Sequence, residues 1–470
     1  MSTPLRVGDL SAELIGTDLW GVTWRGREVL HRLFARARDD AWGTPRAVCT
    51  STRWSQGEGI AIEQHSDASA SGLPVRWTTR YELSDSGLVA DLTATALARA
   101  RVNRLGWCLL HPLSHVGGAV DVSLAGRERR FRFPSLLEPQ PLASDGPRPA
   151  WGPFDELRVS VGDVALLAEF EGDLFETEDQ RNWTDASFKT YSTPLALPRP
   201  HVLEEGQRLH QRVTCRFKQS VRADAHDVEP IACRPGATTW SVLLDSDCAE
   251  ADLDAALTAV DAVRVRVRGD EATSAHHLVA RARASGRAWE LELVCGRVVD
   301  WDGFRRLLAD PRAPEVIIVV PDGPSGSATE TTSGALMQAA ATELGRAHLL
   351  GGGTLHNPCE LLRHDVTQLA VASFTYSPLV HDDDERSIGE TLCTYPAVVA
   401  SVRAASRGAE VSVGPLRDAD RLTPEWVGRS LSAWRDAGAD RICVARASEV
   451  AQGGRLNALG RAVRGAHDSR

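Results

Sequence analysis

Eight alternations of an apolar, strand-like run with a helical run follow one another after Thr238, and this repetition constrains the fold more than any other feature. The strands are predicted at 240–244, 263–268, 289–295, 315–320, 348–351, 367–374, 410–413 and 441–444. Eight such units in about 230 residues match a closed barrel. An open doubly wound sheet is disfavoured, because its glycine-rich first turn is missing. The sequence predicts a (β/α)8 TIM barrel over 238–470.

The first part of the chain has a different texture. Short runs that alternate apolar and polar residues recur between turn residues, as in Arg212–Phe217, whereas long helical periodicity is scarce. This pattern predicts an N-terminal antiparallel β-sandwich domain over 1–222. A charged stretch with proline and glycine then predicts an interdomain linker at 223–237. The expected fold class is multidomain α and β.

Charge and composition exclude several partners. The net charge of −10 is spread along the chain without a basic stripe, which argues against nucleic acid. No apolar run reaches bilayer length, and the first ten residues lack the features of a signal peptide, so no membrane association and a cytoplasmic location are expected. Nine scattered cysteines without a CxxC pair favour free thiols in a reducing compartment.

Residue parity predicts a charged barrel lumen. Arg264, Arg266 and Arg268 alternate with valines in the second predicted strand, and Glu290 and Glu292 alternate with apolar residues in the third. Barrel strands turn their apolar face to the helices, so the charged residues should face the lumen. One interpretation is an internal ion-pair ladder. The other is a polar site at the C-terminal face, with Glu292 as general base and the upper arginines binding substrate.

More polar residues follow the fifth and sixth predicted strands. Asn357 and Glu360 come after a glycine run, and Tyr376, His381 and Glu390 accompany an acidic loop. At a barrel mouth such groups can bind a sugar, and His381 is the second catalytic candidate. A plain tight loop and a solvated acidic loop are the alternatives.

No cofactor or metal is expected. His111 and His115 have i, i+4 spacing, but Pro112 argues against a regular helix there. The other histidines and cysteines lack zinc-ligand spacing, and no GxSxG elbow or P-loop is present.

The stretch 170–191 is the most unusual of the chain. It combines carboxylates, amides, an arginine, a tryptophan, one of only two lysines and one of four tyrosines. Aromatic rings interleaved with hydrogen-bonding groups suit polyol recognition, and a buried polar network that braces two domains is the alternative. The substrate-binding residues predicted here are Glu178, Asp179, Arg181, Trp183, Asp185 and Lys189.

The run EDQRNWTDASFKTY at Glu178–Tyr191, continued by PLALP, resembles the D-apionate lactonase family. The run NRLGWCLLHP at 103–112 resembles the same family's Asn-Arg-x-Gly stretch before Leu-His-Pro, and the glycine run and 378–390 are also similar. The resemblance implies a hydrolase that opens the lactone of D-apionate in carbohydrate catabolism. Family members continue into a further C-terminal β-domain and carry an aromatic-rich Phe-x-Glu-Leu-Asn-Arg where Asn357–Arg363 stands here. A divergent or C-terminally shortened member is therefore expected.

The leading functional prediction is a carboxylic-ester hydrolase that opens a D-apionolactone-like lactone to the aldonic acid. Water activated by Glu292 or His381 would attack the carbonyl. A glycoside hydrolase that pairs Glu292 with Glu360 or Glu390 is the first alternative, and a non-catalytic carbohydrate-binding protein is the second. The expected partner is a small sugar lactone or saccharide, and homo-oligomer formation is left open.

Overall fold

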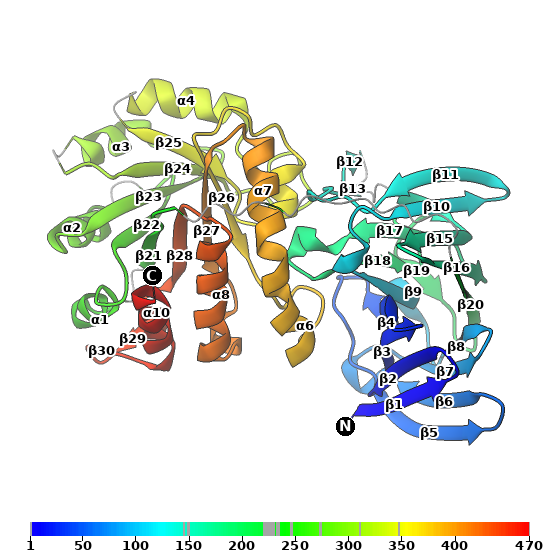
Figure 1. The fold of residues 1–470 in the computed structure, drawn as a ribbon. Coiled ribbons are helices and arrows are strands. Elements are labelled where there is room, and N and C mark those ends of the chain that lie inside the picture. Colours follow the sequence, from blue (N-terminus) through cyan, green and yellow to red (C-terminus); the bar gives the residue numbers. More distant parts are fainter. Residues whose placement is uncertain are drawn as a thin grey trace. The chain divides into compact units, whose positions relative to one another are not determined.

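The structure is a computed structural model that describes residues 2–143, 146–147, 151–219, 231, 236–244, 248–271, 275–309, 312–345 and 348–469. The chain divides into two compact units (Figure 1). Unit 1 comprises 1–141, 147–180 and 187–229, and unit 2 comprises 142–146, 181–186 and 230–470. Most of the predicted linker 223–237 lies outside the described residues, so the boundaries at 222 and 238 stay predictions.

Unit 1 consists of two antiparallel sheets of nine strands each, which confirms the predicted antiparallel β-domain. The first sheet runs in the order β1 (Ser2–Val7), β2 (Leu10–Ile15), β3 (Asp18–Trp24), β4 (Arg27–Asp39), β9 (Ala100–Pro112), β18 (Ser187–Tyr191), β17 (Phe175–Asp179) and β14 (Trp151–Phe154), and β19 (His201–Leu203) pairs with β9. The second sheet runs in the order β11 (Arg127–Arg132), β10 (Ala119–Leu124), β15 (Glu156–Val161), β16 (Val164–Glu171), β20 (Arg208–Gln219), β8 (Gly87–Ala96), β7 (Val75–Ser84), β6 (Ile60–Asp67) and β5 (Val48–Gln56). Apolar residues of both sheets form one core.

Side-chain alternation gives the first sheet a polar outer face. Trp107 of β9, Phe175 of β17 and Phe188 of β18 belong to the core of unit 1. Because successive side chains of a strand point to opposite faces, Glu176 and Lys189 lie on the face turned away from that core.

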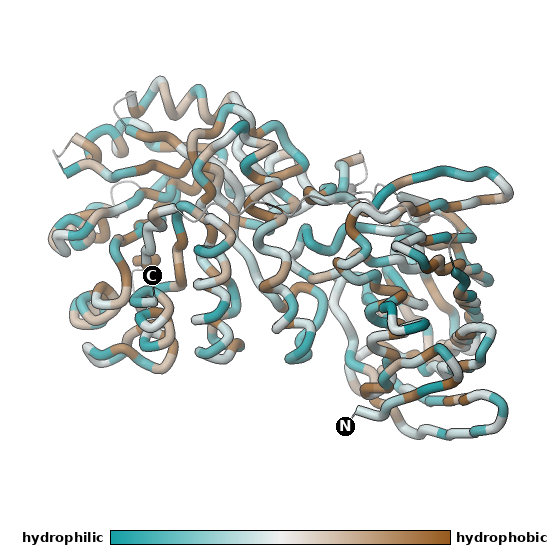
Figure 2. The backbone as a smooth tube through the Cα atoms, in the orientation of Figure 1, coloured by the Kyte–Doolittle hydropathy of each residue, from teal (hydrophilic) through white to brown (hydrophobic). Residues whose placement is uncertain are grey.

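Unit 2 contains a closed barrel of eight parallel strands, which confirms the predicted TIM barrel. The strands are β21 (Thr239–Leu244), β22 (Ala262–Arg268), β23 (Ala288–Cys295), β24 (Val316–Pro321), β25 (Leu349–Gly353), β26 (Val371–Tyr376), β27 (Glu410–Leu416) and β28 (Arg441–Arg446). In Figure 2 the apolar colour is nearly continuous along β24, as expected of a strand buried on both faces.

Helices follow the strands as predicted, with bounds that differ in detail. They are α1 (Glu250–Ala256), α2 (His276–Ala284), α3 (Trp301–Leu308), α4 (Gly334–Leu344), α5 (Pro358–Leu362), α6 (Glu385–Glu390), α7 (Tyr395–Ala405), α8 (Pro424–Asp436), α9 (Ala447–Val450) and α10 (Ala458–Asp468). The helix predicted over 388–406 is divided into α6, a 3-10 turn and α7. Pro396 stands in the first turn of α7, where its missing N–H costs nothing. Among the described helices, none is long and apolar enough to cross a membrane.

The barrel lumen has a charged side. Arg264 donates through Nε to Glu290 Oε2 at 2.7 Å, and through Nη2 to Ser412 Oγ of β27 at 2.8 Å. Since β27 is not a neighbour of β22 in the barrel, this second bond crosses the lumen. Arg441 Nη1 reaches the other oxygen of Glu290 at 2.9 Å. The predicted internal ion pairs are therefore present at this level of the barrel.

Candidate active site

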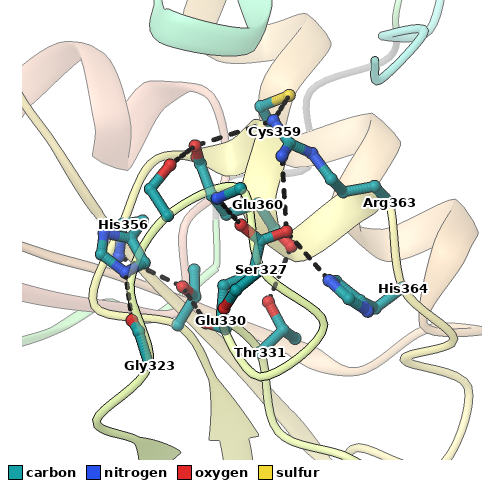
Figure 3. Close-up of polar contacts among 12 residues, drawn as sticks. Gly323, Ser327, Glu330, Thr331, His356, Cys359, Glu360, Arg363 and His364 are labelled. Carbon is teal, nitrogen blue, oxygen red and sulfur yellow. Dashed lines mark hydrogen bonds and ion pairs between the residues drawn. The ribbon is translucent and has the colours of Figure 1, made fainter. Parts of the chain in front are cut away.

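The loops after β24 and β25 are joined by a buried carboxylate, Glu330 (Figure 3). Its Oε2 accepts from the Gly326 amide at 2.5 Å, and its Oε1 lies 2.9 Å from His364 Nε2 and 3.5 Å from Arg363 Nη1. Its carbonyl accepts from Thr354 Oγ1 at 2.6 Å. The contacts to Thr354, Arg363 and His364 join the loop after β24 to the segment after β25 at the C-terminal face, where barrel enzymes react.

Glu360 of α5 is the most notable acid at this end of the barrel, because it is 2% exposed and incompletely bonded. Its Oε1 accepts from Ser325 Oγ at 2.7 Å and lies 3.7 Å from Arg363 Nη2. Its Oε2 has no hydrogen-bond donor among the described residues. A buried carboxylate oxygen without a donor is costly, so it marks a place for a water or a ligand hydroxyl.

Arg417 supplies a matching cation directly after β27. Its Nη2 donates to Asn357 Oδ1 at 2.6 Å, while its Nε has no acceptor within the described part of the chain. Burial lowers the pKa of Arg417, and the negative charges of Asp418 and Glu360 act in the opposite direction. An unsatisfied carboxylate oxygen and an unsatisfied guanidinium N–H thus belong to the same site.

A histidine–aspartate pair is formed by the segment that joins β17 to β18. This segment belongs to unit 2, and Asp185 Oδ2 bonds to Nδ1 of His381 in the loop after β26. Trp183 packs edge-on against the His381 ring at 5.3 Å. Thr184 between them adopts a φ of 71°, which β-branched residues rarely do, and its carbonyl accepts from Thr394 Oγ1 at 3.2 Å. Because Asp185 can only accept, the neutral imidazole carries its lone pair on Nε2.

The predicted pair of Glu292 and Arg266 lies in the upper lumen. Arg266 Nη2 donates to both oxygens of Glu292, at 3.0 and 3.1 Å, and Glu292 is buried. Glu292 shares the lumen face of β23 with Glu290, two residues earlier. Arg268, at the end of β22, is exposed and pairs with Asp322.

Two predicted binding residues lie elsewhere. Tyr376 is fully buried on the helix side of β26, where its hydroxyl bonds to Ser430 Oγ at 3.1 Å and its ring packs on Trp434. The parity of β26 explains this position, because Ser373 and Thr375 face the lumen instead. Glu390 ends α6 and pairs with Arg386 one turn earlier, at 3.0 Å. Neither residue is part of the barrel-mouth cluster.

The six residues predicted within 170–191 are divided between the units. Arg181, Trp183 and Asp185 belong to unit 2, and Arg181 is buried there. Glu178, Asp179 and Lys189 are buried in unit 1. The motif therefore contributes three of these residues to each unit.

The glycine run after the fourth barrel helix serves strand packing. A Cβ on Gly353, whose φ is 154°, would lie 1.8 Å from the Ser373 carbonyl of β26. A Cβ on Gly351 would lie 2.7 Å from that of Val371. Glycine is thus required at both positions because β25 approaches β26 too closely for a side chain.

No group of three or more His, Cys, Asp or Glu side chains that could hold a metal ion occurs among the described residues. His111 and His115 are buried in unit 1 with their rings 6.2 Å apart. Burial lowers the pKa of His115 to about 4 and holds that of His111 well below its usual value. The cysteines that the structure describes are free.

Unit 1 holds a buried acid, Glu176, whose pKa is raised. Burial raises the pKa of Glu176 to about 7, although hydrogen bonds from Tyr191 and from the Leu195 amide and the charge of Arg104 act in the opposite direction. The Tyr191 hydroxyl lies 2.6 Å from Glu176 Oε1 and 2.9 Å from Glu178 Oε2.

This acid predicts a pH dependence of stability. Between pH 4.5 and about 7 the folded chain keeps a proton on Glu176 that the unfolded chain loses, so the free energy of unfolding falls as the pH rises through this window. The loss is on the order of 3 kcal/mol. A glutamine in place of Glu176 still accepts hydrogen bonds from the Tyr191 hydroxyl and the Leu195 amide, but it has no carboxyl group to titrate. In urea unfolding, Glu176→Gln should match the wild type at pH 4 and exceed it at pH 8, and parallel pH profiles would contradict the assignment.

Two residues of this site, Arg417 and Glu330, are not predicted from the sequence. The strand predicted at 410–413 extends to Leu416, so the prediction does not place Arg417 directly after a barrel strand. Glu330 lies in a long loop without periodicity, and no pattern in the sequence indicates its burial.

Comparison with known proteins identifies the family. The model of the D-apionate lactonase N-terminal domain matches residues 1–220, and that of the D-apionate lactonase TIM barrel domain matches 247–447. The D-apionate lactonase of Brucella anthropi is 30% identical over 472 aligned residues, which cover 90% of this chain and 74% of that protein.

Solved structures show only distant likeness. A galactose mutarotase-like protein from Lactobacillus casei is 10% identical with a TM-score of 0.32 and covers 46% of this chain and all of its own. The GH36 α-galactosidase AgaB from Geobacillus stearothermophilus is 9% identical with a TM-score of 0.32, over 99% of this chain and 85% of its own. Likenesses this distant say nothing about the chemistry of this chain. The two family matches and the Brucella relative agree, and the chain belongs to the D-apionate lactonase family.

Proposed function

We propose that this chain opens a sugar-derived lactone, D-apionolactone or a close analogue, to its aldonic acid at the C-terminal end of the barrel. The relative's name supports the reaction class. The observation that carries the location is the unsatisfied Oε2 of Glu360 in the same cluster as Arg417 and Asn357. The proposal places the reaction in carbohydrate catabolism in the cytoplasm.

Glu360 is assigned as general base. Its Oε2 takes a proton from water, and the water oxygen attacks the lactone carbonyl to form a tetrahedral intermediate. The N–H groups of Arg417 stabilise the negative charge on the former carbonyl oxygen. Collapse of the intermediate breaks the bond from carbon to ring oxygen, and the departing alkoxide takes the proton that Glu360 removed from water, or a proton from Nε2 of His381 in its imidazolium form, in which case Glu360 returns its proton to solvent. One water is consumed, and one carboxyl and one hydroxyl group are formed.

The sequence predicts Glu292 as the general base, but we propose a different role for this residue. Both of its oxygens already accept from Arg266, whereas Glu360 has an oxygen to spare. We assign Glu292 and Arg266 to the wall of the upper lumen, where they orient the substrate's hydroxyl groups.

Asp185→Asn tests the role of the histidine pair. An amide at this position can donate to Nδ1 and favours the other tautomer of His381. We expect kcat to fall by about 10- to 100-fold, within the range of general acid–base contributions, and the pH profile of kcat to shift. Asp382→Asn, in the same loop, is the control. An unchanged pH profile for Asp185→Asn would remove His381 from the mechanism.

Substrate screening separates the reaction classes. Purified protein is mixed with a panel of aldonolactones, including D-apionolactone, in a stopped pH-indicator assay, and with aryl glycosides in parallel. Enzyme-dependent acid release from a lactone supports the proposal. Release of phenol from the glycosides would replace it with a glycoside hydrolase, and saccharide binding without turnover of either class would leave a binding protein.

A further inference from the structure

A second polar cluster occupies the outer face of the first sheet in unit 1. Arg104 of β9, Lys189 and Tyr191 of β18, and Glu176 and Glu178 of β17 stand on three adjacent strands. All five are buried. The barrel-mouth chemistry proposed above uses none of them.

The two cations of this cluster are buried and make only long ion pairs to carboxylates among the described residues. Lys189 Nζ and Arg104 Nη1 lie 3.8 and 3.9 Å from Glu178 Oε1, and their side chains are 8% and 10% exposed. Within the described part of the chain, Nε of Arg104 is buried without an acceptor, and both cations also face the Tyr191 ring, at 3.6 Å from Arg104 Cζ and 5.2 Å from Lys189 Nζ. An ammonium offers three donors and a guanidinium five, so this arrangement is costly without a further acceptor.

Glu178 is not that acceptor, because other donors occupy it. Gln140 Nε2 and Gln180 Nε2 donate to its two oxygens at 2.5 and 2.6 Å, and the Tyr191 hydroxyl lies 2.9 Å away. These three neutral donors contact the carboxylate more closely than the two cations do.

The charge balance leaves room for one anion. Burial raises the pKa of Glu176 to about 7, so below that pH Glu178 is the only carboxylate among these five residues and faces two cations. Burial and the neighbouring charges of Arg104 and Arg38 lower the pKa of Lys189, so its ammonium gains from a further anion. A monoanionic group that accepts from both cations would balance the second positive charge.

An exposed aromatic ring adjoins the cluster. Trp42 is 42% exposed, and the guanidinium carbon of Arg104 lies 5.2 Å from its ring centre. A flat apolar surface beside hydrogen-bonding groups suits a chain that carries both C–H and hydroxyl groups.

We propose that Arg104 and Lys189 bind the carboxylate of a polyhydroxy acid on this face of unit 1, with Trp42 contacting its carbon chain. The choice of an aldonate as ligand class rests on the proposed function, whose product is such an acid. The site itself rests on the two buried cations alone.

Calorimetric titration of the full chain with D-gluconate at pH 6 tests the site. Lys189→Gln should weaken gluconate binding by about 10- to 100-fold, the cost of lost charge-assisted hydrogen bonds. The matched control is Lys218→Gln, which changes the only other lysine, on the exposed part of β20. Sorbitol, the uncharged analogue, should not bind, and Trp42→Ala should lower affinity for gluconate more than for acetate.

A barrel variant separates this site from the reaction centre. Arg417→Gln should keep gluconate binding that Lys189→Gln loses. The reverse pattern, or equal affinity in Lys189→Gln and the wild type, would overturn the inference. If Lys189→Gln does not fold, the Trp42→Ala comparison decides, since an unchanged gluconate-to-acetate ratio contradicts the site. Failure of every lactone to react would sink the proposed function without affecting these titrations.

Discussion

Glu360→Gln is expected to lower kcat for lactone hydrolysis by about 10²- to 10⁴-fold, the usual contribution of a general base. Glutamine keeps an oxygen to accept from Ser325 Oγ, so the loop geometry is preserved, but it cannot take a proton from water. KM should change little, because the amide fills the same volume. Initial rates of acid release over a range of lactone concentrations give both constants.

Two further variants test whether the loss of kcat is specific to Glu360. Glu292→Gln should weaken binding and leave most of kcat, whereas the sequence-based prediction expects it to abolish turnover. Glu425→Gln, in the exposed first turn of α8, should have no effect. Full activity of Glu360→Gln together with loss of activity in Glu292→Gln would show that Glu292 in the barrel lumen, and not Glu360, is the general base.

Arg264→Met is expected to reduce the free energy of unfolding of the barrel unit by about 3–5 kcal/mol, the cost of leaving a buried charge partly unpaired. Methionine replaces the aliphatic stem but offers no donor, so Glu290 keeps only Arg441 at 2.9 Å and the weaker Ser241 contact at 3.3 Å. The bond across the lumen to Ser412 is lost as well. Urea unfolding followed by far-UV circular dichroism measures the change.

The comparison variant for this prediction is Arg268→Met, four residues later on the same strand. Arg268 also pairs with a carboxylate, Asp322, but its side chain is 54% exposed, and surface ion pairs contribute about 0–1 kcal/mol. A similar loss of stability in both variants would show that burial of the Arg264 pair has no special importance.

The barrel was predictable because its signal is local and repeated. Each strand of the parallel sheet is covered by helices, so near-continuous apolar runs such as Val316–Pro321 alternate with helical periodicity. Parity also predicted that the arginines and glutamates of these strands share the lumen, because the other face of each strand meets helices. The structure pairs Arg264 with Glu290 and Arg266 with Glu292.

The assembly of the candidate site was less predictable because it depends on contacts distant in sequence. Asp185 and His381 are separated by 196 positions, and no local pattern indicates that a β-domain loop joins the barrel unit. Tyr376 differs from its prediction for a local reason. Side chains alternate along β26, so Thr375 faces the lumen and the ring of Tyr376 faces the helices. Polar composition indicated loops that carry these residues, but the individual partners depend on tertiary structure.

A crystal structure of Glu360→Gln soaked with the best lactone substrate would locate the reaction centre. We expect the lactone at the C-terminal end of the barrel, with its carbonyl oxygen within hydrogen-bond distance of Arg417 and a water between the carbonyl carbon and the side chain at position 360. A lactone bound with its carbonyl away from Arg417 and position 360 would contradict this assignment.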